Sequence, residues 1–462
     1  MIDDVASPPE FALRRFRAYP EYRDSGTDGL GYIPAGWDVR RLKTIASVRL
    51  SNVDKHAVEG QEPVRLCNYI DVYYNERITS SLQFMSASAT PEQVRRFSLR
   101  PGDVLITKDS ESWIDIAVPA VVTEELRDVL CGYHLALIRP DVSILDGRFL
   151  ARAFAAVGIR DQFQVAANGI TRFGLGGDAI QAGVFVVPPL DEQRAIAAFL
   201  DRETAKIDAL VAKKERLIEL LQEKRTVVIT RAVTKGLDPA VPMKDSAVEW
   251  LGAVPAHWQL RPIWTLCDAV SGGTPSREER SFWDGDIPWV SPKDMKRTEI
   301  ASAEESITER AVTETGLKLV SPPVVLIVVR GMILAHSFPV AVTTAQVTIN
   351  QDMKALHCRT GVDPAFMASW FNGVAAGLLG STVEDAAHGT RAIRMDRWRT
   401  LVVPLPLFPE QRAIAQYVSL ELTKLDALAR RVNSGIAYLN ELRTALISAA
   451  VTGKIDVRSH SA

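Results

Sequence analysis

Two long stretches of the chain carry apolar residues with helical spacing. From Glu192 to Thr234 the sequence has neither proline nor glycine. Its apolar residues recur three or four positions apart, or at multiples of these spacings, as on one face of an amphipathic helix. A second such stripe runs through residues 414–446, and Gly236 followed by Pro239 ends the first. The stripe residues are Ile196, Phe199, Ile207, Leu210, Leu217, Leu221 and Val228, then Ile414, Tyr417, Leu425, Leu428, Ile436, Leu439, Leu442 and Leu446. The pattern predicts two helices of about 40 residues, each about 60 Å long.

The second predicted helix repeats the sequence of the first. The hexapeptide EQRAIA occurs at residues 192–197 and again at residues 410–415. The match continues without a gap to Asp238 and Asp456, with about 21 of 47 aligned positions identical, which indicates an internal repeat. An earlier echo pairs IPAGW, ending at Trp37, with VPAHW in the second half.

The repeat predicts that the two helices pair, because neither can bury its stripe alone. Two similar units joined head to tail favour an antiparallel pair with a pseudo-twofold axis. The seam is expected to contain Leu210, Leu221, Leu428 and Leu439. Leu210→Asp or Leu428→Asp would then bury an unpaired charge and destabilise the protein by several kcal/mol. The alternative is a separate surface helix on each domain.

The regions between the repeats differ from one another in sequence and have a mixed α+β pattern. Strands are expected at residues 103–106, 117–122, 324–329 and 400–403, and short helices at 149–157 and 365–374. The expected fold is therefore α+β, with two globular domains separated by two long paired helices. The expected divisions are an N-terminal extension 1–33, a first variable region 34–188, a central helix 189–238, a linker 239–254, a second variable region 255–404, a C-terminal helix 405–456 and a tail 457–462.

The composition limits the possible classes of protein but does not identify a function. A length of 462 residues suggests about three structural units. The formal net charge of -2 argues mildly against DNA binding, because phosphate contacts need Lys and Arg, although charge can be gathered on one face. The four cysteines, which form no C-x-x-C pair, predict reduced thiols rather than a zinc site or a disulfide framework.

The location expected from the sequence is the cytoplasm. The first residues, MIDDVASPPE, lack the basic and apolar regions of a secretion signal. The most apolar run, residues 324–334, is interrupted by Arg330 and is too short to span a bilayer.

The layout and its motifs resemble the specificity subunits of type I restriction-modification systems, across residues 33–456. The resemblance rests on P-x-x-W before each variable region and on EQRAIA at each helix. Three further motifs carry it: SGGTPS at residues 271–276, WDGDIPWVSPKDM at 283–295 and NQDMKAL at 350–356. The first half departs from the pattern, because residues 47–53 stand where SGGTP is expected.

This resemblance implies a non-catalytic DNA-binding subunit. Each variable region would be a target-recognition domain that reads one half of an interrupted, asymmetric site in double-stranded DNA, and the helices would set the spacing between the halves. Two methyltransferase subunits would dock on the helices and nearby surfaces, restriction subunits would join them, and no cofactor or metal is expected. The residues assigned to subunit docking or helix pairing are Glu192, Gln193, Arg194, Leu210, Leu221, Glu410, Gln411, Arg412, Leu428 and Leu439.

Candidate DNA contacts come from polar loops near the predicted strands. The candidates are Lys108, Arg172, Thr274, Lys293, Arg330, His388 and Arg391. Arg172 and Arg391 end the comparable segments NGITR and HGTR before the two helices, and arginine is the commonest base-reading side chain. Lys108 is expected to be exposed in a loop after a strand, where it would suit a phosphate or a guanine edge. Solvated lysines and plain glycine turns are the alternative interpretation.

Two other classes of function compete with this interpretation. One is a fused restriction-methylation enzyme, which would need catalytic and cofactor motifs. Residues 321–324 (SPPV) resemble the adenine methyltransferase tetrapeptide, but a valine stands where the flipped base needs an aromatic partner. The other is a coiled-coil scaffold that never touches nucleic acid.

Overall fold

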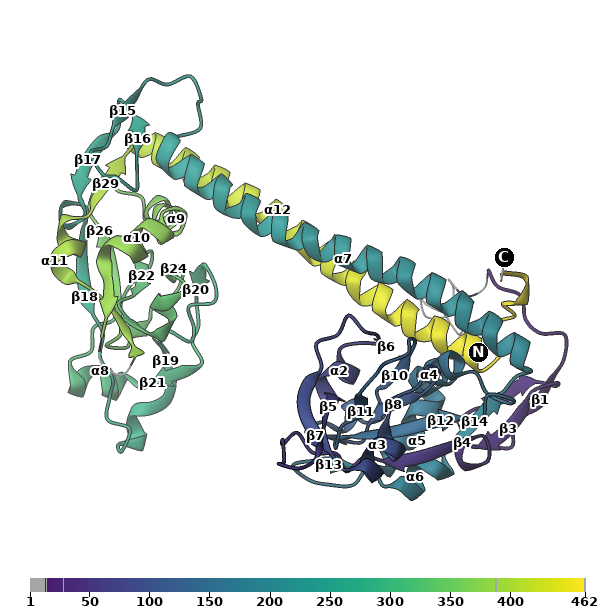
Figure 1. Ribbon diagram of the computed structural model, residues 1–462. Coiled ribbons are helices and arrows are strands. Elements are labelled where there is room, and N and C mark those ends of the chain that lie inside the picture. Colours follow the sequence, from purple (N-terminus) through teal and green to yellow (C-terminus); the bar gives the residue numbers. More distant parts are fainter. Residues whose placement is uncertain (1–12, 14, 28, 387–388, 461–462) are drawn as a thin grey trace. The chain divides into compact units, whose positions relative to one another are not determined.

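The computed structural model describes residues 13, 15–27, 29–386 and 389–460. The chain divides into two compact units: unit 1 contains the chain up to Glu215 and from Asn433 onward, and unit 2 contains Arg216–Val432. The division falls inside both long helices, α7 (Leu190–Lys235) and α12 (Phe408–Val451). The two helices predicted from the repeat are therefore confirmed (Figure 1).

The long helices pair in an antiparallel manner within each unit. In unit 1, Arg443 Nε of α12 lies 2.9 Å from Asp208 Oδ1 of α7, and Gly435 lies against Lys214, so position numbers fall along one helix as they rise along the other. In unit 2, an ion pair joins Arg225 to Asp426. The repeat aligns Arg225 with Arg443 and Asp208 with Asp426. The same pair of residue types thus occurs once in each unit, as the internal repeat leads one to expect.

The predicted seam of the helix pair was wrong for two of its four leucines. Leu210 and Leu428 are each 47 % exposed, whereas Leu221 and Leu439 are partly buried. Between residues 204 and 225, the buried or partly buried positions of α7 are 204, 207, 211, 214, 218, 221 and 225. This alternation of three and four residues is the 3.5-residue period of a coiled coil. The seam position after Ile207 is four residues later, at 211, so Leu210 lies at the edge of the seam.

Unit 1 contains a five-stranded sheet in the order β4-β12-β8-β10-β6, beside a three-stranded sheet β11-β5-β7. Strand pairs β1-β2, β14-β3 and β13-β9 complete it. The strands are β1 (Tyr22–Asp24), β2 (Tyr32–Pro34), β3 (Asp38–Arg41), β4 (Ala46–Leu50), β5 (Glu62–Cys67), β6 (Arg77–Ile78), β7 (Met85–Ala89), β8 (Val104–Thr107), β9 (Asp109–Ser110), β10 (Pro119–Val122), β11 (Val129–Cys131), β12 (Leu135–Pro140), β13 (Phe173–Gly174) and β14 (Val184–Val187). The short helices are α2 (Tyr69–Tyr73), α3 (Pro91–Phe97), α4 (Gly147–Ala155), α5 (Val157–Ala166) and α6 (Gly177–Ala182).

Unit 2 repeats this topology, although its sequence differs. Its five-stranded sheet has the order β18-β26-β22-β24-β20, and in both units the last pair is parallel while the others are antiparallel. The strands are β15 (Met243–Asp245), β16 (Ala253–Pro255), β17 (Gln259–Pro262), β18 (Cys267–Ser271), β19 (Trp283–Val290), β20 (Glu299–Ile300), β21 (Glu305–Ile307), β22 (Val325–Val328), β23 (Arg330–Gly331), β24 (Val340–Thr343), β25 (Thr348–Ile349), β26 (Met353–Cys358), β27 (Val383–Asp385), β28 (Arg391–Ile393) and β29 (Val402–Leu405). The short helices are α8 (Glu309–Thr315), α9 (Pro364–Gly373), α10 (Ala375–Thr382) and α11 (Met395–Thr400). The four predicted strands correspond to β8, β10, β22 and β29, and the two predicted short helices to α4 and α9.

The glutamate of each EQRAIA motif binds the tryptophan of the preceding P-x-x-W motif. Trp37 Nε1 donates to Glu192 at 3.1 Å, and Trp258 Nε1 donates to Glu410 at 3.0 Å. Both tryptophans are among the largest fully buried side chains. The two motifs of the repeat therefore form one structural joint between a variable region and a long helix.

The glutamines next to these glutamates are fully buried, so the prediction that they dock other subunits was wrong. The side-chain oxygen of Gln193 accepts from the backbone N of Asp146 at 2.8 Å, and Gln411 does the same with Asp363 at 2.8 Å. Those aspartates cap α4 and α9. The glutamines thus attach the helices of the variable regions to α7 and α12. Arg194 and Arg412 are exposed, and their docking role stays a prediction.

The described part of the expected N-terminal extension belongs to unit 1. Arg17 forms a β-bridge with Asp456, and the Tyr22 hydroxyl donates to the backbone oxygen of Gly453 at 3.0 Å. The Tyr19 hydroxyl donates to Glu192. The extension therefore joins the end of α12 to the start of α7.

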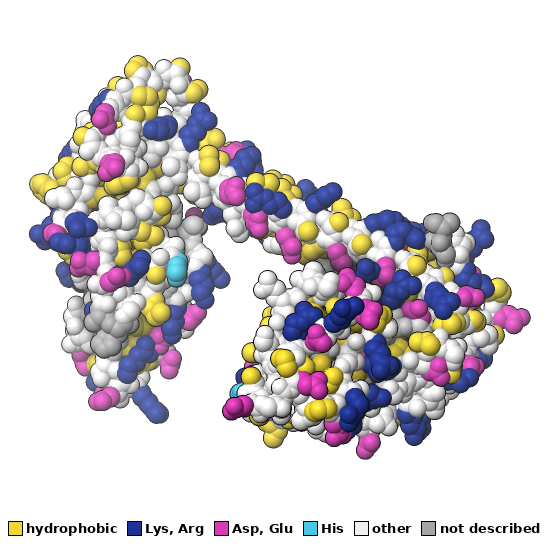
Figure 2. Space-filling model, in the orientation of Figure 1, with side chains coloured by type: hydrophobic (Ala, Val, Ile, Leu, Met, Phe, Trp, Pro, Cys, Tyr) yellow, Lys and Arg dark blue, Asp and Glu magenta, His cyan; other side chains and the backbone are white. Residues whose placement is uncertain are grey.

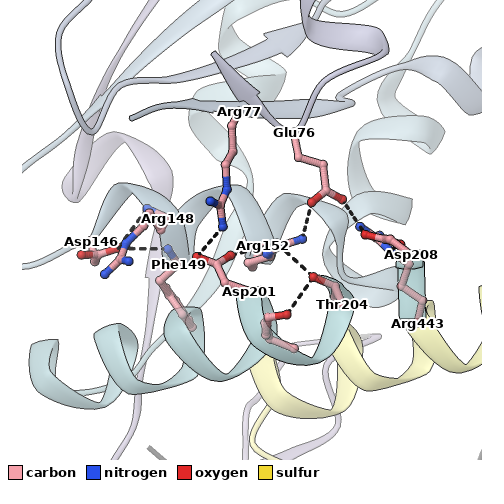
Figure 3. A network of polar contacts seen from close by, with 11 residues as sticks. Glu76, Arg77, Asp146, Arg148, Phe149, Arg152, Asp201, Thr204, Asp208 and Arg443 are labelled. Atoms are coloured by element: carbon pink, nitrogen blue, oxygen red, sulfur yellow. Dashed lines mark hydrogen bonds and ion pairs between the residues drawn. The ribbon is translucent and has the colours of Figure 1, made fainter. Parts of the chain in front are cut away.

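An ion network attaches the first variable region to both long helices (Figure 3). Arg152 of α4 reaches Glu76 at 2.8 Å and Asp201 of α7 at 2.9 Å. Arg443 of α12 pairs with the same Glu76 and with Asp208 of α7. Four segments of unit 1 are thus joined by ion pairs.

None of the helices in the described ranges has the length and the apolar content that a membrane span needs.

Candidate nucleic-acid interface

The predicted DNA-contact residues of unit 1 meet at one end of its five-stranded sheet. Lys108 follows β8, His134 precedes β12, and Arg172 precedes β13. Lys108 Nζ lies 2.6 Å from Asp109 Oδ2 and 4.6 Å from the ring centroid of Tyr133. The sequence missed Asp109, Tyr133 and His134, which are separated from Arg172 by tens of residues.

The prediction that Lys108 is an exposed loop residue was wrong. Its exposed fraction is 8 %, and its charge is paired with Asp109. Its backbone N donates to His134 O at 3.0 Å, and its backbone O accepts from Leu175 N at 2.8 Å. Because both sides of its backbone are bonded, Lys108 is a fixed link between β8 and β9 and not part of an open loop.

Asp109 is held as a carboxylate between two cationic or proton-donating groups. Burial alone would raise the pKa of Asp109, but the hydrogen bonds and charges of Lys108 and His134 outweigh it, so that the pKa is lowered. His134 Nδ1 lies 3.1 Å from Asp109 Oδ2. Since a carboxylate can only accept, Nδ1 carries the proton in this contact.

Arg172 lies on a loop that closes on itself. Asn168 N donates to Gly174 O at 3.0 Å, and Gly174 N donates to Asn168 O at 2.8 Å. Gly169 has φ of 144°, and a Cβ there would lie 1.9 Å from the Arg172 carbonyl oxygen. The glycine therefore has the turn-forming role of the alternative interpretation, while Arg172 itself is exposed.

In unit 2, the SGGTPS and NQDMKAL motifs come together. Gly272 touches the backbone of residues 349–350, where a Cβ would lie 2.0 Å from Ile349 O. Gly273 N donates to the same oxygen at 2.9 Å, and the Thr274 hydroxyl donates to Gln351. Thr274 is exposed at the surface of this joint.

Arginines of unit 2 lie beside the same motif pair. Arg330 Nη2 lies 2.7 Å from Asp352 Oδ1, and Arg391 Nε lies 3.1 Å from Asp385 Oδ1. The strands that carry the two arginines, β23 and β28, are hydrogen-bonded neighbours, as β9 and β13 are in unit 1. Lys293 is exposed after β19. The remaining candidate, His388, lies outside the described residues.

Equivalent positions of the two sheets hold contacting polar pairs in which the acidic and the basic residue exchange places. Asp109 and Arg330 follow β8 and β22, which have matching places in their sheets, and His134 and Asp352 precede β12 and β26. The pair is Asp109–His134 in unit 1 and Arg330–Asp352 in unit 2. One scaffold therefore presents different polar groups at the same place.

The surface around these positions is mixed in charge and partly apolar. Figure 2 shows Lys and Arg interspersed with Asp and Glu on the visible face of each globular part. Turns of helix after β9 and β23 expose Trp113, Ile114 and Met332. In the described ranges, no three His, Cys, Asp or Glu side chains are grouped as a metal site requires.

Comparisons with known proteins give relatives of one kind, although no family model matches the chain. The Escherichia coli type I restriction enzyme EcoR124I/EcoR124II specificity subunit is 32 % identical over 258 residues, which are 54 % of this chain and 56 % of the relative. The Methanocaldococcus jannaschii MjaIX specificity subunit is 27 % identical over 37 % of this chain and 39 % of its own length. These alignments span about half, or less, of the relatives. The putative MjaX specificity subunit of the same archaeon is 20 % identical over 93 % of this chain and 96 % of its length.

Solved structures show the same fold. The HsdS subunit from Thermoanaerobacter tengcongensis matches with a TM-score of 0.54 and 17 % identity, over 92 % of this chain and 98 % of that one. A chain from a structure of type I R-M complex assembly and conformational transition matches with a TM-score of 0.65 and 18 % identity, over 91 % and 98 %. The chain is thus similar in sequence to type I restriction enzyme specificity subunits and shares the fold of an HsdS subunit.

Proposed function

We propose that this chain is the DNA-reading subunit of a type I restriction-modification complex and performs no chemistry on the DNA itself. The observation that carries the proposal is the duplication: two variable regions of one topology, on two copies of one helix, present different polar groups at equivalent positions. Each variable region would read one half of an interrupted site. Two half-sites multiply discrimination, since each wrong base pair costs about 1–3 kcal/mol.

The proposed DNA contacts are the exposed members of the two polar clusters. Arg172 would serve the first half-site, and Arg330 and Arg391 the second, because arginine matches the acceptor edge of guanine. Thr274 and Lys293 would contact the backbone or base edges nearby. His388 stays a prediction from sequence, and Lys108 is proposed to support Asp109 rather than to touch DNA. The exposed apolar side chains after β9 and β23 suit thymine methyl groups.

The long helices are proposed to dock two methyltransferase subunits, which restriction subunits would join. Large apolar side chains remain exposed along them: Leu210, Leu217, Leu220, Tyr417, Leu420, Leu428 and Tyr438. Exposed apolar surface of this kind marks protein interfaces. These side chains lie off the seam between α7 and α12, so a partner could bury them without opening the helix pair.

A domain exchange tests the proposal. Residues 259–403 are replaced with the second variable region of another specificity subunit, and the methylated motif is read by methylome sequencing of cells carrying the complex. Only one half of the motif should change. A change in both halves, or no methylation motif with the parent chain, would refute modular recognition.

A second test measures whether the helices set the spacing. Seven residues are inserted in each long helix near the unit boundary, because the seam repeats every seven residues. The insertion adds about 10 Å at 1.5 Å per residue, which corresponds to about three base pairs. Both half-sites should be retained with a longer spacer. An unchanged spacer would contradict the proposal. A gel shift with DNA at several salt concentrations tests the alternative function, because a scaffold without DNA affinity would give no salt-dependent shift.

A further inference from the structure

One arginine of the candidate interface has no acidic partner. Arg172 Nη2 lies 3.1 Å from His134 Nδ1 and 3.3 Å from Nε2. Among the described residues, no carboxylate lies within ion-pair distance of Arg172, whereas Arg330 and Arg391 each pair with an aspartate. In the described part of the chain, the charge of Arg172 therefore has no carboxylate counter-charge, and its guanidinium contacts an imidazole ring.

The orientation of that ring is fixed from its other side. Asp109 accepts from His134 Nδ1, and Lys108 holds Asp109 in place at 2.6 Å. Arg172 Nη2 is nearly equidistant from the two ring nitrogens, so the guanidinium lies against the imidazole ring that Asp109 orients. The order of the contacts is thus Lys108, Asp109, His134 and Arg172.

We propose that His134 is a positioning residue: it holds the Arg172 guanidinium so that this group can form two hydrogen bonds with one guanine of the first half-site. The inference rests on the proposed function. A bidentate guanine contact uses two N–H groups of the five that arginine carries, so the contact with His134 leaves enough donors for the base. Loss of the contact would leave Arg172 attracted to DNA but without a fixed orientation.

The test uses the full chain in complex with its methyltransferase subunits and duplexes in which each base pair of the methylated motif is changed in turn. Arg172→Ala should reduce discrimination at one G·C pair of one half-site by about tenfold to a hundredfold. His134→Leu should reduce discrimination at the same pair by about tenfold, and His134→Asn, which keeps a donor and an acceptor, should retain most of it. Discrimination in the other half-site should not change.

The distribution of the loss over the base pairs decides the role of His134. An effect of His134→Leu that is spread evenly over all base pairs, or no rescue by His134→Asn, would overturn the positioning role. If Arg172→Ala reduces discrimination at one base pair and the His134 variants do not, the proposed function stands but the positioning role of His134 fails. If no change of base pair alters binding, the proposed function itself fails.

Discussion

Replacing Arg152 by methionine tests whether the ion network fixes the first variable region to the long helices. The Arg152 side chain is 9 % exposed and contacts Glu76 and Asp201, whose side chains are 47 % and 20 % exposed. Breaking a fully buried pair costs about 3–5 kcal/mol, because a charge is left without a partner. Here each carboxylate keeps another arginine, Arg443 or Arg77. We therefore expect a loss of about 2–3 kcal/mol.

Arg77→Met is the matched control. Arg77 makes one ion pair with the same Asp201, at 2.9 Å, but its side chain is 51 % exposed. Exposed pairs contribute less than about 1 kcal/mol. The assay is hydrogen exchange of residues 147–155 in increasing urea, because a chain of two units need not unfold in one step. If Arg152→Met and Arg77→Met lower the stability of residues 147–155 by the same amount, the expected difference between the buried and the exposed arginine is refuted.

The same network predicts a pH dependence. Burial alone would raise the pKa of Glu76, but the charges of Arg152 and Arg443 outweigh it and lower the pKa. A carboxyl group with a lowered pKa in the folded state stabilises the protein above the unfolded value, about 4.3 for glutamate, and loses that contribution as the pH falls through the folded pKa. The stability difference between the parent chain and Arg152→Met should therefore shrink below about pH 4. A constant difference from pH 7 to pH 3 would contradict this assignment.

Three further substitutions probe the helices, each by thermal or urea unfolding. Gln193→Leu leaves three backbone groups without their partner and should cost about 3 kcal/mol or more; a cost below 1 kcal/mol would argue against the joint. Gly435→Ala should stabilise α12 by up to about 1 kcal/mol, because only the mobile end of Lys214 lies in the way of the new methyl group. Leu210→Asp, at a half-exposed position, should cost far less than Ile207→Asp in the seam. Similar costs for the two aspartates would show that the seam is misplaced.

The repeat and the two helices could be predicted from sequence because they depend on local patterns. Helical periodicity is a property of neighbours three and four residues apart, so Leu190–Lys235 and Phe408–Val451 were expected within a few residues. Buried strands such as β8 and β22 were recognisable as short apolar runs. Which leucines of each stripe lie in the seam was only partly predictable, because it depends on how two helices wind around each other.

The tertiary structure alone decided what each motif does. The EQ dipeptide, which looked like a docking signal, proved to bind a tryptophan and a helix cap from distant segments. Four cysteines that are far apart in the sequence lie in two cross-strand pairs, with Cys267 Sγ and Cys358 Sγ 3.5 Å apart.

The candidate interface could likewise be predicted only in part. Arg172, Arg330 and Arg391 were expected from residue type and from glycine turns nearby. Their partners were not, and neither was the burial of Lys108, because Asp109, His134 and Asp352 come from other strands. Periodicity records which face of an element is buried, whereas contacts between strands far apart in the chain depend on sheet order and register, which are set by the packing of the whole unit.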